Sequence, residues 1–147
     1  MPSRWLAAVA FAASTAFLAA PAQADATLWK GQTSQGRLAS ARTGTDEIVN
    51  RVRIRWKARC RDSTRTGQTV FVPPLDSATA TEFGDAGTSR SNLGGGVRSR
   101  DTVSVQGTLG GDGRWRGRYK LRSVLRRDGE VVDRCRVGPV RWRARPV

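Results

Sequence analysis

The sequence predicts an all-β fold, an antiparallel β-sandwich or small barrel of about 8–9 strands with one disulfide. Three observations support this prediction. Apolar and polar residues alternate with a period of two in several segments, glycine-rich turns separate these segments, and helical periodicity is nearly absent after residue 24. A period of two places one face of a strand on a core and the other in water.

The first half of the domain is expected to begin with strands over 26–33 and 37–43, followed by the strongest strand, over 48–60. In that strand two sets of side chains alternate. Val52, Ile54, Trp56, Ala58 and Cys60 share the predicted core face, and Arg51, Arg53, Arg55, Lys57 and Arg59 share the other.

The middle of the chain has the weakest pattern. A polar loop is expected over 61–68, then a strand over 69–72 that ends at Pro73-Pro74. A short strand is expected at 79–83. The segment 85–96 is rich in glycine and serine, which predicts a flexible loop.

The last part of the chain returns to alternation, with strands expected over 102–109, 114–125, 130–135 and 139–145. Gly110 to Gly113 is typical of a turn, and Asp128-Gly129 is a strong hairpin signal.

Residues 1–24 have the pattern of a cleaved signal peptide. Arg4 precedes an uncharged run over 5–20, and Ala22-Gln23-Ala24 is a small-x-small cleavage site. The run is short for a membrane span, which needs about 20 apolar residues. The sequence therefore predicts export to the periplasm or the extracellular space. The mature chain, 25–147, would be a single domain with no transmembrane segment.

Cys60 and Cys135 are the only cysteines. An even pair in an exported chain predicts a disulfide. Histidine is absent, so a metal site on these two sulfurs is disfavoured. We expect no metal and no cofactor.

Two short motifs lie at the ends of the predicted domain. Gly31 to Gly36 reads G-x-T-S-Q-G, and Cys135 to Ala144 reads C-x-x-G-x-V-x-W-x-A. With these motifs the chain resembles a group of small exported bacterial proteins. The resemblance implies export, one disulfide and an all-β fold, and it implies no catalytic activity.

Residues able to move protons near neutral pH are scarce. The Ser–His and Cys–His nucleophile systems require histidine, which the chain lacks. Most of its acidic residues lie beside Gly, Ser or Thr, where aspartate caps turns. We therefore expect no catalytic residue, and a carboxylate-based hydrolase is kept as an alternative. Trp29, Trp56, Trp115 and Trp142 alternate with cations and are expected in the core.

Positive charge is the most marked feature of the composition, with 26 Lys and Arg against 12 Asp and Glu. Three predicted strands present rows of cations, which are the candidate polyanion-binding residues: Arg51, Arg53, Arg55, Lys57 and Arg59; Arg114, Arg116, Arg118, Lys120 and Arg122; Arg141, Arg143 and Arg145. Two interpretations stay open. The rows are either the solvated faces of strands in an arginine-rich protein or a surface that binds polyanions.

The preferred functional prediction is a non-catalytic binding module that docks on an anionic polymer or membrane surface through its cationic strand faces. Export makes nucleic acid a less favoured partner. The alternatives are a protein-interaction or inhibitor-type domain that acts through residues 75–96, and the hydrolase.

Overall fold

The computed structural model describes residues 25–147, which form an all-β fold of nine antiparallel strands without a helix. The predicted fold class and disulfide are confirmed, whereas the predicted signal peptide lies outside the described residues. The strands are β1 (Leu28–Thr33), β2 (Leu38–Thr43), β3 (Val49–Cys60), β4 (Thr64–Phe71), β5 (Ser77–Ala78), β6 (Glu82–Gly94), β7 (Val97–Leu109), β8 (Trp115–Arg127) and β9 (Glu130–Pro146). No helix in this part of the chain could cross a membrane.

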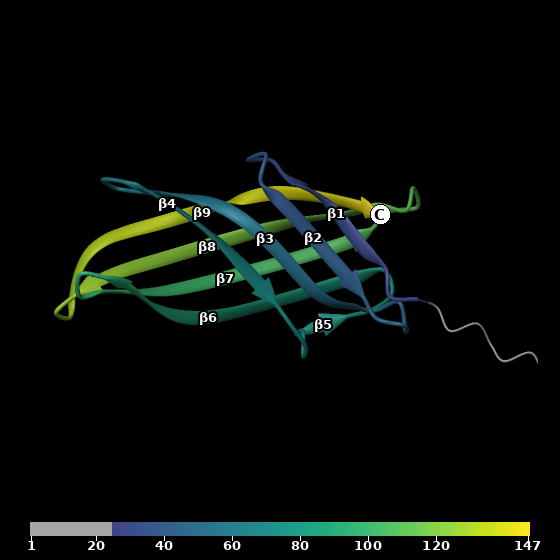
Figure 1. Cartoon of the computed structure of the whole chain (residues 1–147), viewed down its shortest axis with the longest axis horizontal. Coiled ribbons are helices and arrows are strands. Elements are labelled where there is room, and N and C mark those ends of the chain that lie inside the picture. The colour runs from purple at the N-terminus through teal and green to yellow at the C-terminus, as the bar shows by residue number, and fades with distance from the viewer. Residues whose placement is uncertain (1–24) are drawn as a thin grey trace, which may run out of the picture.

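One sheet contains all the strands, in the order β4-β3-β2-β1-β9-β8-β7-β6-β5. The half formed by β1 to β4 lies across the half formed by β6 to β9 (Figure 1). β9 joins the two halves, because it pairs with β8 along one edge and with β1 along the other. Its first part also pairs with the end of β3, where Cys60 lies opposite Cys135.

The core fills the space between the two halves. Its largest fully buried side chains are Trp115, Tyr119, Ile54 and Leu121. In β3, buried and exposed residues alternate as the sequence predicts. Trp56, Trp115 and Trp142 are buried, and Trp29 is partly buried with its ring edge-on to Trp115 at a centroid distance of 6.3 Å.

The segment 85–96 was wrongly predicted to be a loop. Most of it belongs to β6, which pairs with β7 from Glu82 to Gly94. Its residues from Ala86 to Gly94 are exposed, so both faces of the strand carry small polar side chains and no alternation marks them. Backbone pairing with β7 forms the strand without a buried apolar face.

Further boundaries differ from the prediction. The strand expected at 79–83 is interrupted, because β5 ends at Ala78 and Thr79 forms a turn with Glu82, where β6 begins. The strand expected at 102–109 begins earlier, at Val97, as β7.

β4 begins at Thr64, inside the expected polar loop, because it pairs with β3 from Arg59 to Val52. The last two predicted strands are a single strand, β9, which continues through Gly138 and Pro139. Gly138 has a φ of 93°, a conformation that glycine adopts without strain, and the register with β8 shifts beside it.

Candidate polyanion-binding surface

The cationic rows of β8 and β9 lie side by side. Arg116 is opposite Arg143, and Arg118 is opposite Arg141. All four side chains are exposed. Directly opposite side chains of an antiparallel pair are about 5 Å apart at Cβ, so these rows form one continuous positive strip.

The cationic row of β3 meets this strip at only one end. Arg59 lies opposite Arg136 of β9. Arg51, Arg53 and Arg55 lie between β2 and β4, in the other half of the sheet. The three predicted rows therefore do not form one patch: the strip includes the rows of β8 and β9 together with Arg59, and excludes the rest of the β3 row.

Several cations that the sequence interpretation omitted extend the strip over β7 and the start of β9. Arg136 lies opposite Arg122, and Arg98 lies opposite Arg126. Arg98 and Arg136 are the chain neighbours of the buried residues Ser99 and Cys135, so their side chains point to the opposite, outward face of the sheet. We call the whole surface the cationic face: Arg59, Arg98, Arg100, Arg114, Arg116, Arg118, Lys120, Arg122, Arg126, Arg134, Arg136, Arg141, Arg143 and Arg145.

Few carboxylates neutralise this face. Within residues 25–147, Arg116 is the one member that forms an ion pair, with Asp112 in the turn before β8. Nη1 and Nη2 of Arg116 donate to the two Asp112 carboxylate oxygens, at 2.9 Å and 2.5 Å. The hydrogen bond from Arg116 lowers the pKa of Asp112 to about 2, so this pair stays charged at any ordinary pH.

A groove of about 980 Å³ crosses the cationic face. Arg116, Arg118, Arg141 and Arg143 line it. Neutral polar side chains line it as well, namely Gln32, Ser34, Ser77, Gln106 and Thr108, and Glu82 is the one acidic residue. Gly107 and Gly117 lie opposite each other below the groove, and the Trp142 ring packs against both of them on the core side.

The turn between β1 and β2 fixes one end of this groove. The backbone N–H of Ser34 donates to the carbonyl of Arg141 at 2.6 Å, and the backbone N–H of Arg141 donates to Oγ of Ser34 at 3.2 Å. Oγ1 of Thr33 accepts from the backbone N–H groups of Gln35 and Arg37, which holds the turn closed. Ser34 is therefore held beside Arg141.

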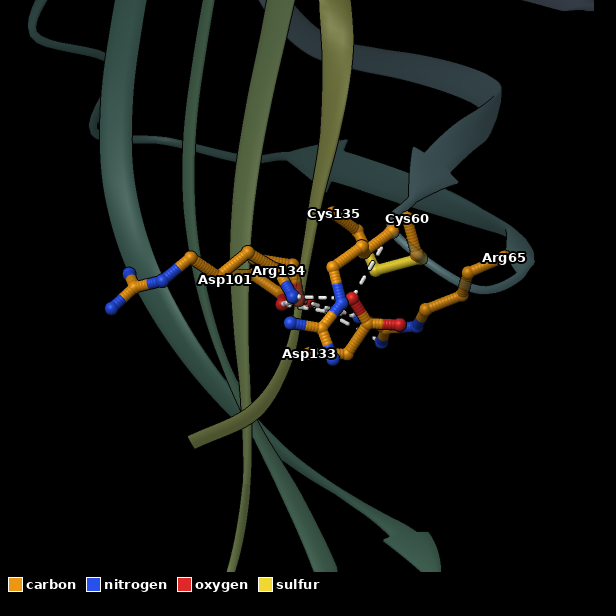
Figure 2. Close-up of a disulfide and its surroundings, with 8 residues drawn as sticks. Cys60, Arg65, Asp101, Asp133, Arg134 and Cys135 are labelled. Atoms are coloured by element: carbon orange, nitrogen blue, oxygen red, sulfur yellow. Dashed lines mark hydrogen bonds and ion pairs between the residues drawn. A yellow bond between two sulfur atoms is a disulfide. The ribbon is translucent and has the colours of Figure 1, made fainter. Parts of the chain in front are cut away.

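A second polar cluster lies between β4 and the inner faces of β7 and β8, and the sequence analysis did not predict it. Arg65 donates from Nη1 to Asp101 at 3.2 Å and to Oγ of Ser123 at 2.9 Å. Ser123 in turn donates to Asp101 at 2.5 Å. Figure 2 shows Arg65 and Asp101 near the disulfide. Asp101 shares the inner face of β7 with Val103 and Val105. The sequence already shows this, because Asp101 lies two residues before Val103 in a strand whose alternate residues are apolar.

The partners of Asp101 define its role. Its side chain is 8% exposed, and it forms an ion pair with Arg65. A carboxylate held this way is a structural anchor between β4 and β7. The guanidinium of Arg65 also lies 5.6 Å from the centre of the Trp56 ring, a cation–π distance.

A third set of hydrogen bonds ties Tyr119 to β4. The hydroxyl groups of Tyr119 and Thr69 are 2.7 Å apart, and the indole N–H of Trp56 donates to Thr69 at 3.0 Å. Burial raises the pKa of the Tyr119 hydroxyl well above its usual value. Tyr119 is therefore a neutral hydrogen-bonding residue of the core.

Cys60 and Cys135 form the disulfide, with Asp133 nearby (Figure 2). The three side chains offer ligand atoms within 4.8 Å of one another. Both sulfurs are bonded to each other, so they are not thiolate ligands for a metal. A disulfide is compatible with an oxidising compartment.

Asp133 lies among arginines on β9, and its carboxylate is held by backbone groups. It accepts hydrogen bonds from the backbone N–H groups of Arg61, at 3.0 Å, and Arg134, at 2.7 Å. Burial raises the pKa of Asp133, and these backbone donors outweigh that effect and hold the pKa below its usual value. The residue fastens the β3–β4 turn to β9.

Comparisons with protein-family models, with curated protein sequences and with solved structures find no match to this chain.

Proposed function

We propose that this protein is an exported, non-catalytic binding module that docks on anionic polymers through the cationic face. The observation that supports this most directly is the register of β8 and β9. It places arginine opposite arginine at three positions, Arg116–Arg143, Arg118–Arg141 and Arg122–Arg136.

Like charges directly opposite each other destabilise a sheet. If solubility were the only requirement, a strand face with both positive and negative residues would be more stable, because opposite charges paired across strands stabilise a sheet. The cationic face lacks this mixture, because Asp112 is its only ion-pair partner within residues 25–147. A bound polyanion would relieve the repulsion, and arginine is suited to that role because its planar fork binds carboxylate, sulfate or phosphate with two hydrogen bonds.

Localisation and partner follow from the same proposal. The disulfide between Cys60 and Cys135 is compatible with an oxidising compartment, and the sequence of residues 1–24 supports export to the periplasm or beyond. The polyanions available there are envelope and extracellular polymers and lipid head groups, which favours them over nucleic acid.

Salt-dependent binding tests the proposal. The purified chain with its disulfide formed should bind immobilised heparin, and its affinity should fall steeply as the salt concentration rises. A triple Arg→Gln variant at Arg100, Arg122 and Arg136 should show a shallower salt dependence than a control triple variant at Arg51, Arg53 and Arg55. Both variants lose the same charge, and only the first three residues belong to the cationic face. Equal effects of the two variants would contradict the proposal, and so would no binding near physiological salt.

A second candidate function is favoured by the edge of β6. The N–H of Ala86 donates to Asp76, and beyond it residues 87–94 pair with β7 on one edge and with no strand on the other. An extended peptide could add to such an edge as a further strand. This function predicts a discrete protein partner that stays bound at high salt, and a proline replacing Thr88 would abolish that binding.

A further inference from the structure

We infer that the groove across the cationic face is a binding site for an acidic oligosaccharide, a sugar chain that carries carboxylate or sulfate groups. This inference rests on the proposed function and names the ligand class and the residues that select it. Arg118 and Arg141 are the anion-binding pair at its centre.

The first argument is the charge distribution in the groove. Arg118 and Arg141 lie directly opposite each other, and Arg116 and Arg143 form the next pair along the same two strands. The two pairs are about 7 Å apart along the strands, twice the rise per residue. Arg116 is already held by Asp112, so Arg118, Arg141 and Arg143 are the cations available to a ligand.

The second argument is the mixture of cations with neutral hydrogen-bonding groups. Gln32 lies opposite Arg143 and Gln106 opposite Arg118, so each cation has an amide beside it. Ser34 is fixed beside Arg141 because its backbone N–H donates to the Arg141 carbonyl and its Oγ accepts from the Arg141 N–H. Amides and hydroxyls suit the hydroxyl groups of a sugar, whereas a phosphate chain presents acceptors alone.

The third argument is the asymmetry of the groove. Its arginines lie at the centre, on β8 and β9, whereas Glu82 of β6 and Ser77 of β5 lie at one end, with Thr108 between Glu82 and Arg116. A carboxylate repels an anionic group and accepts a hydrogen bond from a hydroxyl group. Glu82 therefore favours the hydroxyl-bearing side of a sugar at that end and disfavours a uniformly charged chain.

The remaining ligand classes fit the groove less well. The aromatic residues in its lining, Phe83 and Trp142, are 4% and 2% exposed, so no ring is available on which a base could stack. Exposed large apolar residues such as Val72, Leu93 and Val131 lie outside the lining, so the groove has no apolar anchor for a lipid surface. The polar lining favours the acidic sugar.

Two charge-matched double variants test this inference. Arg118→Gln/Arg141→Gln removes the central pair of the groove, and Arg122→Gln/Arg136→Gln removes an equivalent opposite pair on the same two strands outside the groove lining. Circular dichroism and thermal unfolding establish that both variants fold. The probes are a heparin-derived octasaccharide, linear polyphosphate of similar charge, and vesicles containing anionic lipid, each titrated in physiological salt.

The groove variant should lose about tenfold or more in affinity for the octasaccharide, since hydrogen bonds to charged groups are among the strong ones. The control variant removes two cations of the same face outside the groove, so it should also lose affinity for the octasaccharide, by a clearly smaller factor. The two variants should weaken polyphosphate binding equally. Glu82→Gln should strengthen polyphosphate binding more than octasaccharide binding.

Other results overturn the inference in ways that can be told apart. Equal losses of octasaccharide affinity in the two double variants would refute the groove site while leaving the proposed function intact. A selective loss of polyphosphate or vesicle binding in the groove variant would replace the acidic sugar with that ligand class. No binding of any probe by the unmodified protein would refute the proposed function itself.

Discussion

Arg65 of β4 reaches the carboxylate of Asp101 on β7, with Nη1 at 3.2 Å from Oδ1, although these strands share no backbone pairing. The ion pair is mostly shielded, with 20% of the Arg65 side chain and 8% of the Asp101 side chain exposed. It links one end strand of the sheet to the opposite half of the molecule. Its contribution is therefore expected to appear in stability.

Asp101→Asn should lower the free energy of unfolding by about 3 kcal/mol, because it leaves Arg65 charged and without its carboxylate partner. Chemical denaturation monitored by circular dichroism measures this. The double variant Arg65→Met/Asp101→Leu should recover most of the loss, since apolar residues of similar volume often replace a buried ion pair without cost. A single variant as stable as the unmodified chain would contradict the assignment of this pair as an anchor.

Gly67→Ala should destabilise the protein by about 1–3 kcal/mol through overpacking. A Cβ atom at Gly67 would lie 2.6 Å from Cζ2 and 2.7 Å from Cη2 of Trp56, whose ring packs on this glycine. The control is Gly87→Ala in β6, where a Cβ atom meets nothing within 4 Å. Denaturation midpoints should separate the two variants clearly, and similar midpoints would show that Trp56 can move away.

Reduction of the disulfide, or Cys60→Ser/Cys135→Ser, should lower stability by about 4 kcal/mol if loop entropy dominates. The bond closes a loop with a sequence separation of 75. Thermal unfolding with and without a thiol reductant measures the effect on the unmodified chain. The reductant should leave the double serine variant unchanged, and a shift in that variant would indicate an effect unrelated to the disulfide.

The Asp112–Arg116 pair should be visible in a pH titration. The folded-state pKa of Asp112 is lowered from 3.8 to about 2, so any stability from the pair is fully present above pH 3.8 and is lost as pH falls through about 2. Carbon-13 NMR of the Asp112 carboxyl group should give a midpoint near 2. In Arg116→Gln the midpoint should move up towards 3.8, and an unchanged midpoint would exclude Arg116 as the cause.

The strands that could be predicted from the sequence are those with one buried face. Over residues 51–60 of β3 and 115–122 of β8, cations alternate with apolar or small residues, because each strand has the core on one side and water on the other. The outer part of β6 has water on both sides, so its side chains carry no pattern. The polar residue Arg65 faces inward from β4, which made the start of that strand look like a loop.

The candidate site was predictable in its residues and not in its arrangement. Alternation identified Arg118 and Arg141 as outward-facing, but their contact depends on the register of β8 with β9. That register includes shifts near Leu121 and Arg126, and the local sequence pattern does not predict where such shifts occur. The separation of the β3 row from the others also depends on strand order, since β1 and β2 lie between β3 and β9 along most of their length.

The position of β9 has a consequence for how the molecule is assembled. β9 is the last strand of the chain, and in the strand order it is the only link between β1 to β4 and β5 to β8. In a chain that emerges from its N-terminus, backbone pairing can therefore join β1 to β4 with β5 to β8 only after β9 has emerged. Until residues 130–146 emerge, the apolar residues of the two halves lack the strand that holds them together, and incompletely paired strands of this kind are prone to aggregation. The cationic face is likewise completed only at that last step, when the arginines of β9 arrive beside those of β8.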